Sequence, residues 1–241
     1  MTALALCAGL TGIRFAMASN WEAATAMVLA AVLLDALDGH IARMVRGESR
    51  FGAELDSLSD AIAFGVAPAL ILFLWTLEAL PRIGWTVALV YAVFTALRLA
   101  RFNAAIDTAD QPHKSAGFLT GVPAPAGAGL ALLPMYLWLW TDHWLFREPW
   151  LVAPWLALVA FLMVSSLATF SKSSVRLRRT VRFEVIAGLV VLVAALLSAP
   201  WPTLALLAIV YALTIPVSVI GYRRVRRLRA AAPAVPPRPP A

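Results

Sequence analysis

The sequence is poor in charged residues and has almost no cysteine. Only 14% of its 241 residues are charged, and Cys7 is the single cysteine, which excludes an intramolecular disulfide. Hydrophobic residues make up 61% of the chain, whereas soluble domains contain roughly 45–50%. The scarcity of charge therefore excludes an ordinary soluble domain and predicts a polytopic membrane protein. The net charge of +7 is then better explained by membrane topology than by nucleic-acid binding.

Eight apolar stretches approach the length of a membrane-spanning helix, which needs about 20 residues. We expect them at 2–17, 21–44, 55–77, 83–104, 117–140, 150–170, 183–197 and 201–222. The segment 198–202 is either a tight turn or a break in one long helix. One helix over 183–222 would be about 60 Å long, twice the hydrocarbon core, which favours two passes. The prediction is an all-α membrane bundle of about eight helices that forms one domain over residues 1–222.

The basic residues predict the orientation of this bundle. Most of the 20 lysines and arginines fall in alternate loops and in the tail, whereas the opposite loops hold only Arg82 and Arg147. By the positive-inside rule, both termini are expected on the cytoplasmic side of the cytoplasmic membrane. Six tryptophans are expected at the other interface: Trp75, Trp85, Trp140, Trp144, Trp150 and Trp201. The tail at 223–241 is basic and then proline-rich, and we expect it to be disordered.

Four aspartates stand out against this apolar background: Asp35, Asp38, Asp56 and Asp60. The first two are three residues apart and the last two are four apart, so each pair lies on one face of a helix. One aspartate near a helix end is commonly a cap, but carboxylates at membrane depth are costly and indicate a functional site. Because four converging carboxylates would repel one another, we expect a divalent cation, or two, among Mg²⁺, Mn²⁺ and Ca²⁺.

The neighbouring residues indicate that the ligand is larger than a bare ion. Metals held by carboxylates stabilise a phosphoryl group under attack, and Arg43 can add a positive charge for a phosphate. Small residues flank the carboxylates and let a bulky ligand approach the backbone; they are Gly39, Ala42 and Gly52. Asp60 is the deepest aspartate by helix placement. It is therefore the candidate that accepts a proton from an attacking alcohol.

The acidic stretch reads Asp35-x-x-Asp38-Gly39-x-x-Ala42-Arg43 and, after eight residues, Gly52-x-x-x-Asp56-x-x-x-Asp60. This pattern resembles the complete signature of the CDP-alcohol phosphatidyltransferase family, whose members join a CDP-linked lipid to an alcohol and release CMP. The resemblance implies that Asp35, Asp38, Asp56 and Asp60 bind metal and that Asp60 is also the general base. It implies CDP contacts for a further set: Asp35, Gly39, Ala42, Arg43 and Gly52.

Three other segments resemble the phosphatidylserine synthase branch of this family; they are 56–69, 98–103 and 118–126. This resemblance implies that CDP-diacylglycerol is the donor, L-serine the acceptor, and phosphatidylserine and CMP the products. A serine carboxylate needs basic partners, for which the candidates are Arg98, Arg101 and Lys114, and Asn103 could bond the headgroup. Positive-inside topology alone would also account for these basic residues. By analogy with the family, we expect a homodimer.

Three other interpretations remain open. The same chemistry could use glycerol 3-phosphate, inositol phosphate or choline as the acceptor, although a phosphorylated acceptor would call for a denser basic pocket. A transporter or cation channel could use the aspartates as an ion pathway. That interpretation does not explain why Arg43 and the small residues accompany the aspartates, or why all four aspartates cluster on one side of the membrane. A structural membrane scaffold is the third.

Overall fold

The computed structural model describes residues 2–45, 50–106, 118–165, 168–170 and 182–231. Within these ranges the chain is helical apart from two strands of three residues each, which pair with each other. The prediction of an all-α fold is therefore confirmed for the described part, with one short strand pair in addition.

The elements follow one another in this order. The first half contains α1 (Thr2–Met17), α2 (Trp21–Val45), α3 (Arg50–Asp60), the π-helix η1 (Ala61–Val66), α4 (Ala67–Trp75), the 3₁₀-helix η2 (Leu77–Ala79) and α5 (Ile83–Ile106). The second half contains β1 (Phe118–Thr120), α6 (Ala124–Ala131), α7 (Leu133–Thr141), the 3₁₀-helix η4 (Trp144–Arg147), α8 (Pro149–Val164), β2 (Ala168–Phe170), α9 (Arg182–Ser198) and α10 (Pro200–Ala231).

Two of the described helical stretches are long and apolar enough to cross a membrane. They are Phe51–Trp75, in which α3, η1 and α4 form one continuous rod, and Ile83–Ala104 in α5. Shorter apolar helices cover Thr2–Met17, Pro149–Val164, Ala187–Ser198 and Pro200–Pro216. These helices support a membrane protein, while the count of eight passes and the orientation stay predictions.

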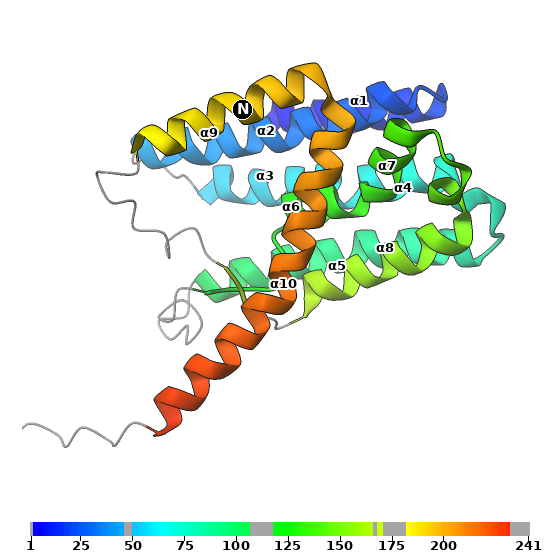
Figure 1. Ribbon diagram of the computed structural model, residues 1–241. Coiled ribbons are helices and arrows are strands. Elements are labelled where there is room, and N and C mark those ends of the chain that lie inside the picture. Colours follow the sequence, from blue (N-terminus) through cyan, green and yellow to red (C-terminus); the bar gives the residue numbers. More distant parts are fainter. Residues whose placement is uncertain (1, 46–49, 107–117, 166–167, 171–181, 232–241) are drawn as a thin grey trace, which may run out of the picture.

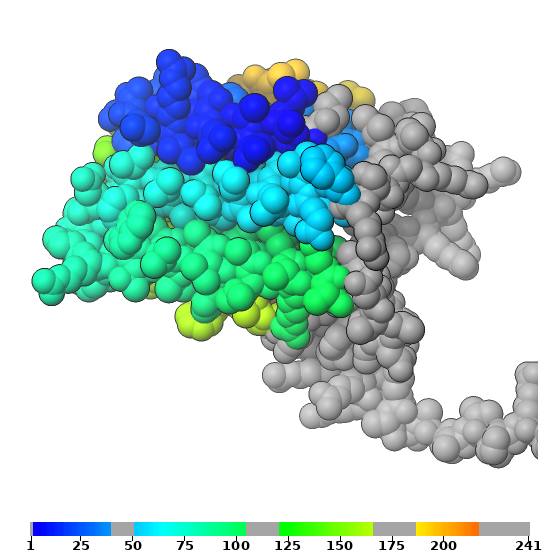
Figure 2. All heavy atoms as spheres, turned by 180° about the vertical axis from the view of Figure 1, so that it is seen from behind, coloured from blue at the N-terminus to red at the C-terminus, as the bar shows by residue number. Residues whose placement is uncertain are grey.

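Small residues allow α1 to approach its neighbours closely. Its buried face consists of Ala5, Ala8, Gly9, Gly12 and Ala16, and it packs against α2, α4 and η1. A Cβ on Gly9 would lie 2.8 Å from the Cα of Ala63 in η1, so only glycine permits this contact. Figure 2 shows α1 (blue), the α3–α4 rod (cyan) and α5 (green) as three adjoining layers of one face. This close packing holds α2 and α3, which carry the aspartates, in a fixed relation.

The prediction of one helix at 117–140 is wrong for the first part of this range. In the second part the helix is interrupted. Strand β1 replaces the first turn, and α6 begins only at Ala124, after Pro123 with ψ near 145°. Gly121 has φ +73°, and a Cβ there would lie 2.5 Å from the carbonyl oxygen of Met163, which excludes a helical turn at this position. The helix then breaks at Leu132, and α7 starts at Leu133 with Pro134, which has no backbone N–H to donate, in its first turn.

Strand β1 pairs with β2 in an antiparallel register that places Leu119 opposite Thr169. The helix expected at 150–170 is therefore too long, because α8 ends at Val164 and Ser165 adopts an extended conformation. The two strands tie the segment before α6 to the segment after α8. The missing helical turns are thus explained by a pairing between residues 50 positions apart, which no local pattern contains.

The break expected at 198–202 is confirmed, because α9 ends at Ser198 and α10 starts at Pro200. Helix α10 then crosses over α7, α6 and β2 (Figure 1). It continues to Ala231, so the basic first part of the predicted tail, 223–231, is helical here, and a disordered tail stays a prediction. Apart from Val225, this stretch consists of arginine, leucine and alanine, and all three favour helix. Residues 232–241 lie outside the described part.

Candidate functional site

Three aspartates from two helices converge at one end of the bundle. Asp35 on α2 and Asp56 and Asp60 on α3 each offer a carboxylate oxygen, and these three oxygens all lie within 4.8 Å of one another. All three side chains are partly buried. The predicted meeting of the two acidic pairs is confirmed for these residues.

The convergence carries a large electrostatic cost. Two unit charges about 5 Å apart repel by roughly 3 kcal/mol at an effective dielectric constant of about 20, and three such pairs are present here. Oxygen ligands lie about 2.0–2.6 Å from Mg²⁺ or Ca²⁺, so two ligands of one ion are at most about 4–5 Å apart. The observed spacing fits a shared hard cation, which would remove the repulsion.

Asp38 lies outside this group of three oxygens and bonds to the start of the chain. Its Oδ2 accepts a hydrogen bond from the hydroxyl of Thr2 on α1. The carbonyl of Thr2 in turn accepts a bond from the Ser59 hydroxyl on α3, at 3.0 Å. Thr2 therefore links all three helices around the acidic cluster. Neither Thr2 nor Ser59 was predicted from the sequence, because nothing in a motif on α2 and α3 indicates that α1 returns to it.

The small residues of the motif leave open space beside the carboxylates. Gly39 follows Asp38 on α2 and is exposed, and a Cβ built on it meets no atom within 4 Å. Gly52 lies in the first turn of α3 and is exposed as well. Ala42 and Arg43 belong to the last turns of α2, but their side chains lie outside the described part. The predicted room for a bulky ligand is therefore present at Gly39.

The predicted basic residues have different environments. Arg98 on α5 is partly buried and interacts electrostatically with Asp60, and its Nε is buried without a hydrogen-bond partner in the described structure. Arg101 is exposed and donates from Nη1 to the carbonyl of Val164, at 3.3 Å. It thereby satisfies a carbonyl at the C-terminal end of α8.

The other two candidates for the acceptor pocket are Asn103 and Lys114. The side-chain amide of Asn103 donates to the Ser57 hydroxyl at 2.7 Å, so it joins α5 to α3 next to the cluster. Lys114 lies outside the described residues. Among the candidates that the structure describes, Arg98 combines an electrostatic interaction with Asp60 and a buried, unpartnered donor.

A π-helix follows directly after Asp60 and sets the cluster apart from the apolar half of the same rod. Such segments are rare and frequently occur at functional sites. The buried Tyr91 on α5 donates its hydroxyl hydrogen to the carbonyl of Phe64 in η1, at 3.1 Å. A Cβ on Gly65 would lie 3.0 Å from the Cβ of Thr95. Contacts with α5 therefore stabilise the wider turn.

Comparisons with known proteins agree with this geometry. The model of the CDP-alcohol phosphatidyltransferase family matches residues 1–163, and that of CDP-alcohol phosphatidyltransferase 2 matches residues 181–216. The first match contains the acidic motif and α5. The second covers all of α9 and the first half of α10.

Several curated relatives carry the name CDP-diacylglycerol–serine O-phosphatidyltransferase. One from Mycobacterium tuberculosis (strain ATCC 25618 / H37Rv) is 40% identical over 227 residues, which is 92% of this chain and 78% of the relative. One from Mycobacterium leprae is 38% identical over 225 residues, covering 92% and 74%. One from Helicobacter pylori (strain ATCC 700392 / 26695) is 40% identical over 136 residues, covering 56% and 55%.

The family match thus spans most of the chain and includes the aspartates that the fold brings together. With its convergent carboxylates, its open glycine face and these relatives, the chain belongs to the CDP-alcohol phosphatidyltransferase family.

Proposed function

We propose that this protein transfers the phosphatidyl group of CDP-diacylglycerol to L-serine and releases phosphatidylserine and CMP. The observation that carries the proposal is the convergence of Asp35, Asp56 and Asp60 beside the open face at Gly39. This arrangement suits a diphosphate that needs both a charged anchor and space. Serine as the acceptor is supported by the names of the relatives and by the segments at 56–69 and 98–103.

Asp35, Asp56 and Asp60 would hold the divalent cation, and Asp38 would join them after release from Thr2. Mg²⁺ or Mn²⁺, as one ion or two, would neutralise the diphosphate and stabilise the departing CMP. Ca²⁺ is the third ion that the same oxygens could bind. Gly39, Ala42, Arg43 and Gly52 would border the CDP moiety, as the family signature implies.

The chemical step is a direct displacement at phosphorus. The serine hydroxyl oxygen forms a bond to the β-phosphorus of CDP-diacylglycerol, and the bond from that phosphorus to the bridging oxygen breaks. The electron pair of the broken bond leaves with CMP. Asp60 accepts the serine hydroxyl proton as the new bond forms. No covalent enzyme intermediate is required.

The membrane location follows from the donor. Its acyl chains stay in the bilayer, while CDP and serine are soluble and reach the site from the cytoplasm. The acidic cluster lies near one end of the membrane-length rod Phe51–Trp75, where a lipid phosphate would be found. The cytoplasmic orientation and a homodimeric assembly belong to the same proposal.

The acceptor is tested by supplying four alcohols in parallel. Purified protein with CDP-diacylglycerol and Mn²⁺ or Mg²⁺ should form a radiolabelled lipid from serine. Glycerol 3-phosphate, inositol phosphate and choline should give at most a few per cent of that rate. A higher rate with one of these three would retain the reaction class and replace serine as the acceptor. Reactions without CDP-diacylglycerol measure the background.

Arg98 is the residue that we expect to bind the serine carboxylate. It interacts electrostatically with Asp60 and has a buried, unpartnered Nε, so a carboxylate there would satisfy the donor while the hydroxyl faces the base. A charge-assisted hydrogen bond contributes about 1.5–3 kcal/mol, which corresponds to about 10- to 100-fold in affinity. Arg98→Ala should therefore raise the KM for serine by at least about tenfold and that for CDP-diacylglycerol by less than about threefold.

Arg101→Ala is the matched control for this experiment. It removes an arginine one turn away on the same helix, but this one is exposed and bonds to Val164. Both KM values should stay within about twofold of wild type. If Arg98→Ala shifts the two KM values equally in protein with a normal unfolding temperature, Arg98 does not belong to the serine pocket.

A further inference from the structure

A cavity lies far from the acidic cluster, and the proposed reaction gives it no role. It has a volume of about 770 Å³. Its lining comes from the end of α4, η2, the end of α7, η4 and the residue before α8: Leu74, Trp75, Thr76, Glu78, Ala79, Trp138, Asp142, Trp144, Arg147 and Glu148. Asp60 and Trp75 belong to one helical rod and are separated by about 20 Å at 1.5 Å per residue.

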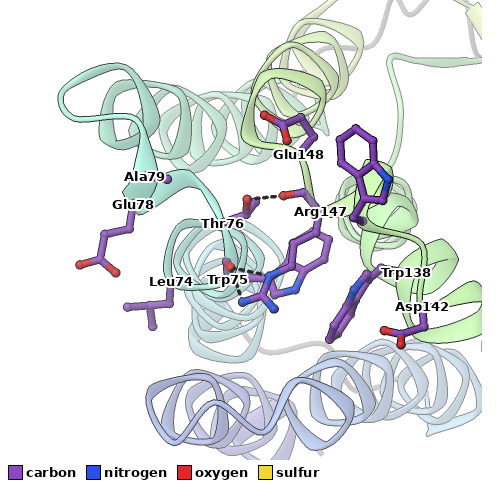
Figure 3. Close-up of a pocket in the computed structure, with 10 residues that line it drawn as sticks. Leu74, Trp75, Thr76, Glu78, Ala79, Trp138, Asp142, Arg147 and Glu148 are labelled. Atoms are coloured by element: carbon purple, nitrogen blue, oxygen red, sulfur yellow. Dashed lines mark hydrogen bonds between the residues drawn. The ribbon is translucent and has the colours of Figure 1, made fainter.

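Three carboxylates line this cavity, and none is neutralised within it. Glu78 and Asp142 are exposed and Glu148 is partly buried. Their side chains form no ion pair and no hydrogen bond with another residue of the described structure. In Figure 3, Glu78, Asp142 and Glu148 lie on different sides of the central pair Trp75 and Arg147. With one arginine, the lining carries a formal charge of −2, which attracts a positively charged group.

Arg147 forms the only positive part of the lining, and its position is fixed. Its Nε and Nη2 donate to the carbonyl of Trp75 at 3.4 and 3.2 Å. The guanidinium carbon lies 5.2 Å from the ring centroid of Trp138 and 6.0 Å from that of Trp21, which adds cation–π attraction. The hydroxyl of Thr76 donates to the carbonyl of Arg147. These bonds do not use Nη1, which keeps donors for a ligand.

Trp75 adds an unused donor to the same wall. Its side chain is 2% exposed, and its Nε1 is buried with no hydrogen-bond partner in the described structure. Leaving a buried donor unpaired costs about 1–3 kcal/mol, so a small shift of the ring that let a ligand acceptor reach Nε1 would stabilise this wall. The ring of Trp75 contacts that of Trp138 with centroids 5.7 Å apart. The cavity therefore combines aromatic surface, two unused donors and unpaired carboxylates.

We propose that this cavity binds a zwitterionic headgroup, in which an ammonium group is linked to a phosphate. The ammonium group is attracted by the net negative charge of the three carboxylates and lies against a tryptophan face, where cation–π attraction contributes. The phosphate oxygen accepts hydrogen bonds from Arg147 and Trp75. A free metal cation would leave both donors unused, and a free phosphate would be repelled by the three carboxylates. Only a ligand with both charges satisfies the whole lining.

The test compares glycerophosphocholine with its two halves. Wild-type protein in an uncharged maltoside detergent is titrated by calorimetry with glycerophosphocholine, with choline and with glycerol 3-phosphate. Glycerophosphocholine should bind saturably and at least about tenfold more tightly than either half. Asp142→Asn combined with Glu148→Gln should weaken this binding by at least about tenfold, because the cavity loses two of its three negative charges.

Trp144→Ala and Trp150→Ala form a matched pair that locates the site. Both tryptophans are largely exposed, at 68% and 65%, and only Trp144 lines the cavity. Trp144→Ala should weaken binding several-fold, and Trp150→Ala should bind like wild type. The proposal is overturned if glycerophosphocholine shows no saturable binding, if choline alone binds as tightly, or if the acidic double variant binds like wild type.

Nanodiscs then distinguish a lipid headgroup from a soluble ligand. If bilayer lipids fill the cavity, added glycerophosphocholine binds more weakly in phosphatidylcholine discs than in phosphatidylglycerol discs. Equal affinity in both discs identifies a soluble ligand of the same chemistry. Both results support the headgroup assignment and differ only in its source. The proposal does not depend on serine as the acceptor, because it is measured without turnover.

Discussion

Asp56→Asn is expected to lower the rate of CMP release by at least about a thousandfold. The carboxylate of Asp56 lies within 4.8 Å of those of both Asp35 and Asp60, so it is shared by any cation bound there. Asparagine keeps the shape but loses the charge that a hard cation needs. A thousandfold loss corresponds to about 4 kcal/mol, within the several kcal/mol that a catalytic metal contributes. The measurement is CMP release with CDP-diacylglycerol and serine.

Glu54→Gln is the matched control. Glu54 precedes Asp56 by two residues on the same helix and is exposed, so the substitution removes the same charge from outside the cluster. Its rate should stay within about twofold of wild type. Asp56→Asn also relieves repulsion between like charges, so its unfolding temperature in metal-free buffer should not fall. A near-wild-type rate in folded Asp56→Asn protein would contradict catalysis by this cluster.

Removal of divalent metal is expected to reduce the activity to background. The three carboxylates would then repel one another without a counter-charge, and the diphosphate would be repelled by all of them. The measurement is CMP release after incubation with a chelator and dialysis, followed by addition of Mg²⁺, Mn²⁺ or Ca²⁺ singly. Restoration by Mg²⁺ or Mn²⁺ to near the starting rate is expected.

Thermal unfolding provides a readout of this metal that does not depend on turnover. A ligand that binds only the folded state stabilises it by about 2.7 kcal/mol at a concentration of 100 Kd. Mn²⁺ should therefore raise the unfolding temperature of wild-type protein and have a much smaller effect on Asp56→Asn. Full activity in the presence of chelator, together with an unfolding temperature insensitive to Mn²⁺, would exclude the metal step.

The part of the site that could be predicted from sequence is the part that depends on helical spacing. Asp56 and Asp60 share a face because they are four residues apart, and Asp35 meets them because α2 and α3 are consecutive helices. Asp38 behaves differently because its surroundings include Thr2, which is distant in sequence. A spacing rule predicts the direction of a side chain along one helix, and it does not predict which third helix meets it.

Arg98 and Arg101 illustrate the same limit. Their spacing of three residues placed them on one face of α5 and suggested a common role. In the structure Arg98 interacts electrostatically with Asp60, whereas Arg101 donates to the carbonyl of Val164 at the end of α8. The difference arises because α8 stops at Val164, and this end depends on the pairing of β1 with β2. That pairing connects residues 50 positions apart and leaves no local signal.

The cavity between η2 and η4 could not be predicted either. Two of its three tryptophans, Trp75 and Trp144, are expected in an interfacial belt, which explains their presence but not their arrangement, and Trp138 is not part of that expectation. The contact of Arg147 with the Trp75 carbonyl joins residues 72 positions apart. Composition indicates that tryptophans prefer the membrane–water interface. It does not indicate that two turns distant in the sequence meet to form a cavity.

The π-helix Ala61–Val66 has a consequence for how this protein can be aligned with its relatives. A wider turn accommodates about one extra residue, which offsets the preceding turns by about 100° relative to an uninterrupted α-helix. The direction in which Asp56 and Asp60 point relative to α4 therefore depends on this wider turn as well as on their spacing from each other. A relative with an ordinary helix here would need a one-residue gap within 61–66 for its aspartates to correspond. An alignment without this gap would match the residues of the motif. It would misalign the buried face of the following helix, which includes Ile71 and Leu72.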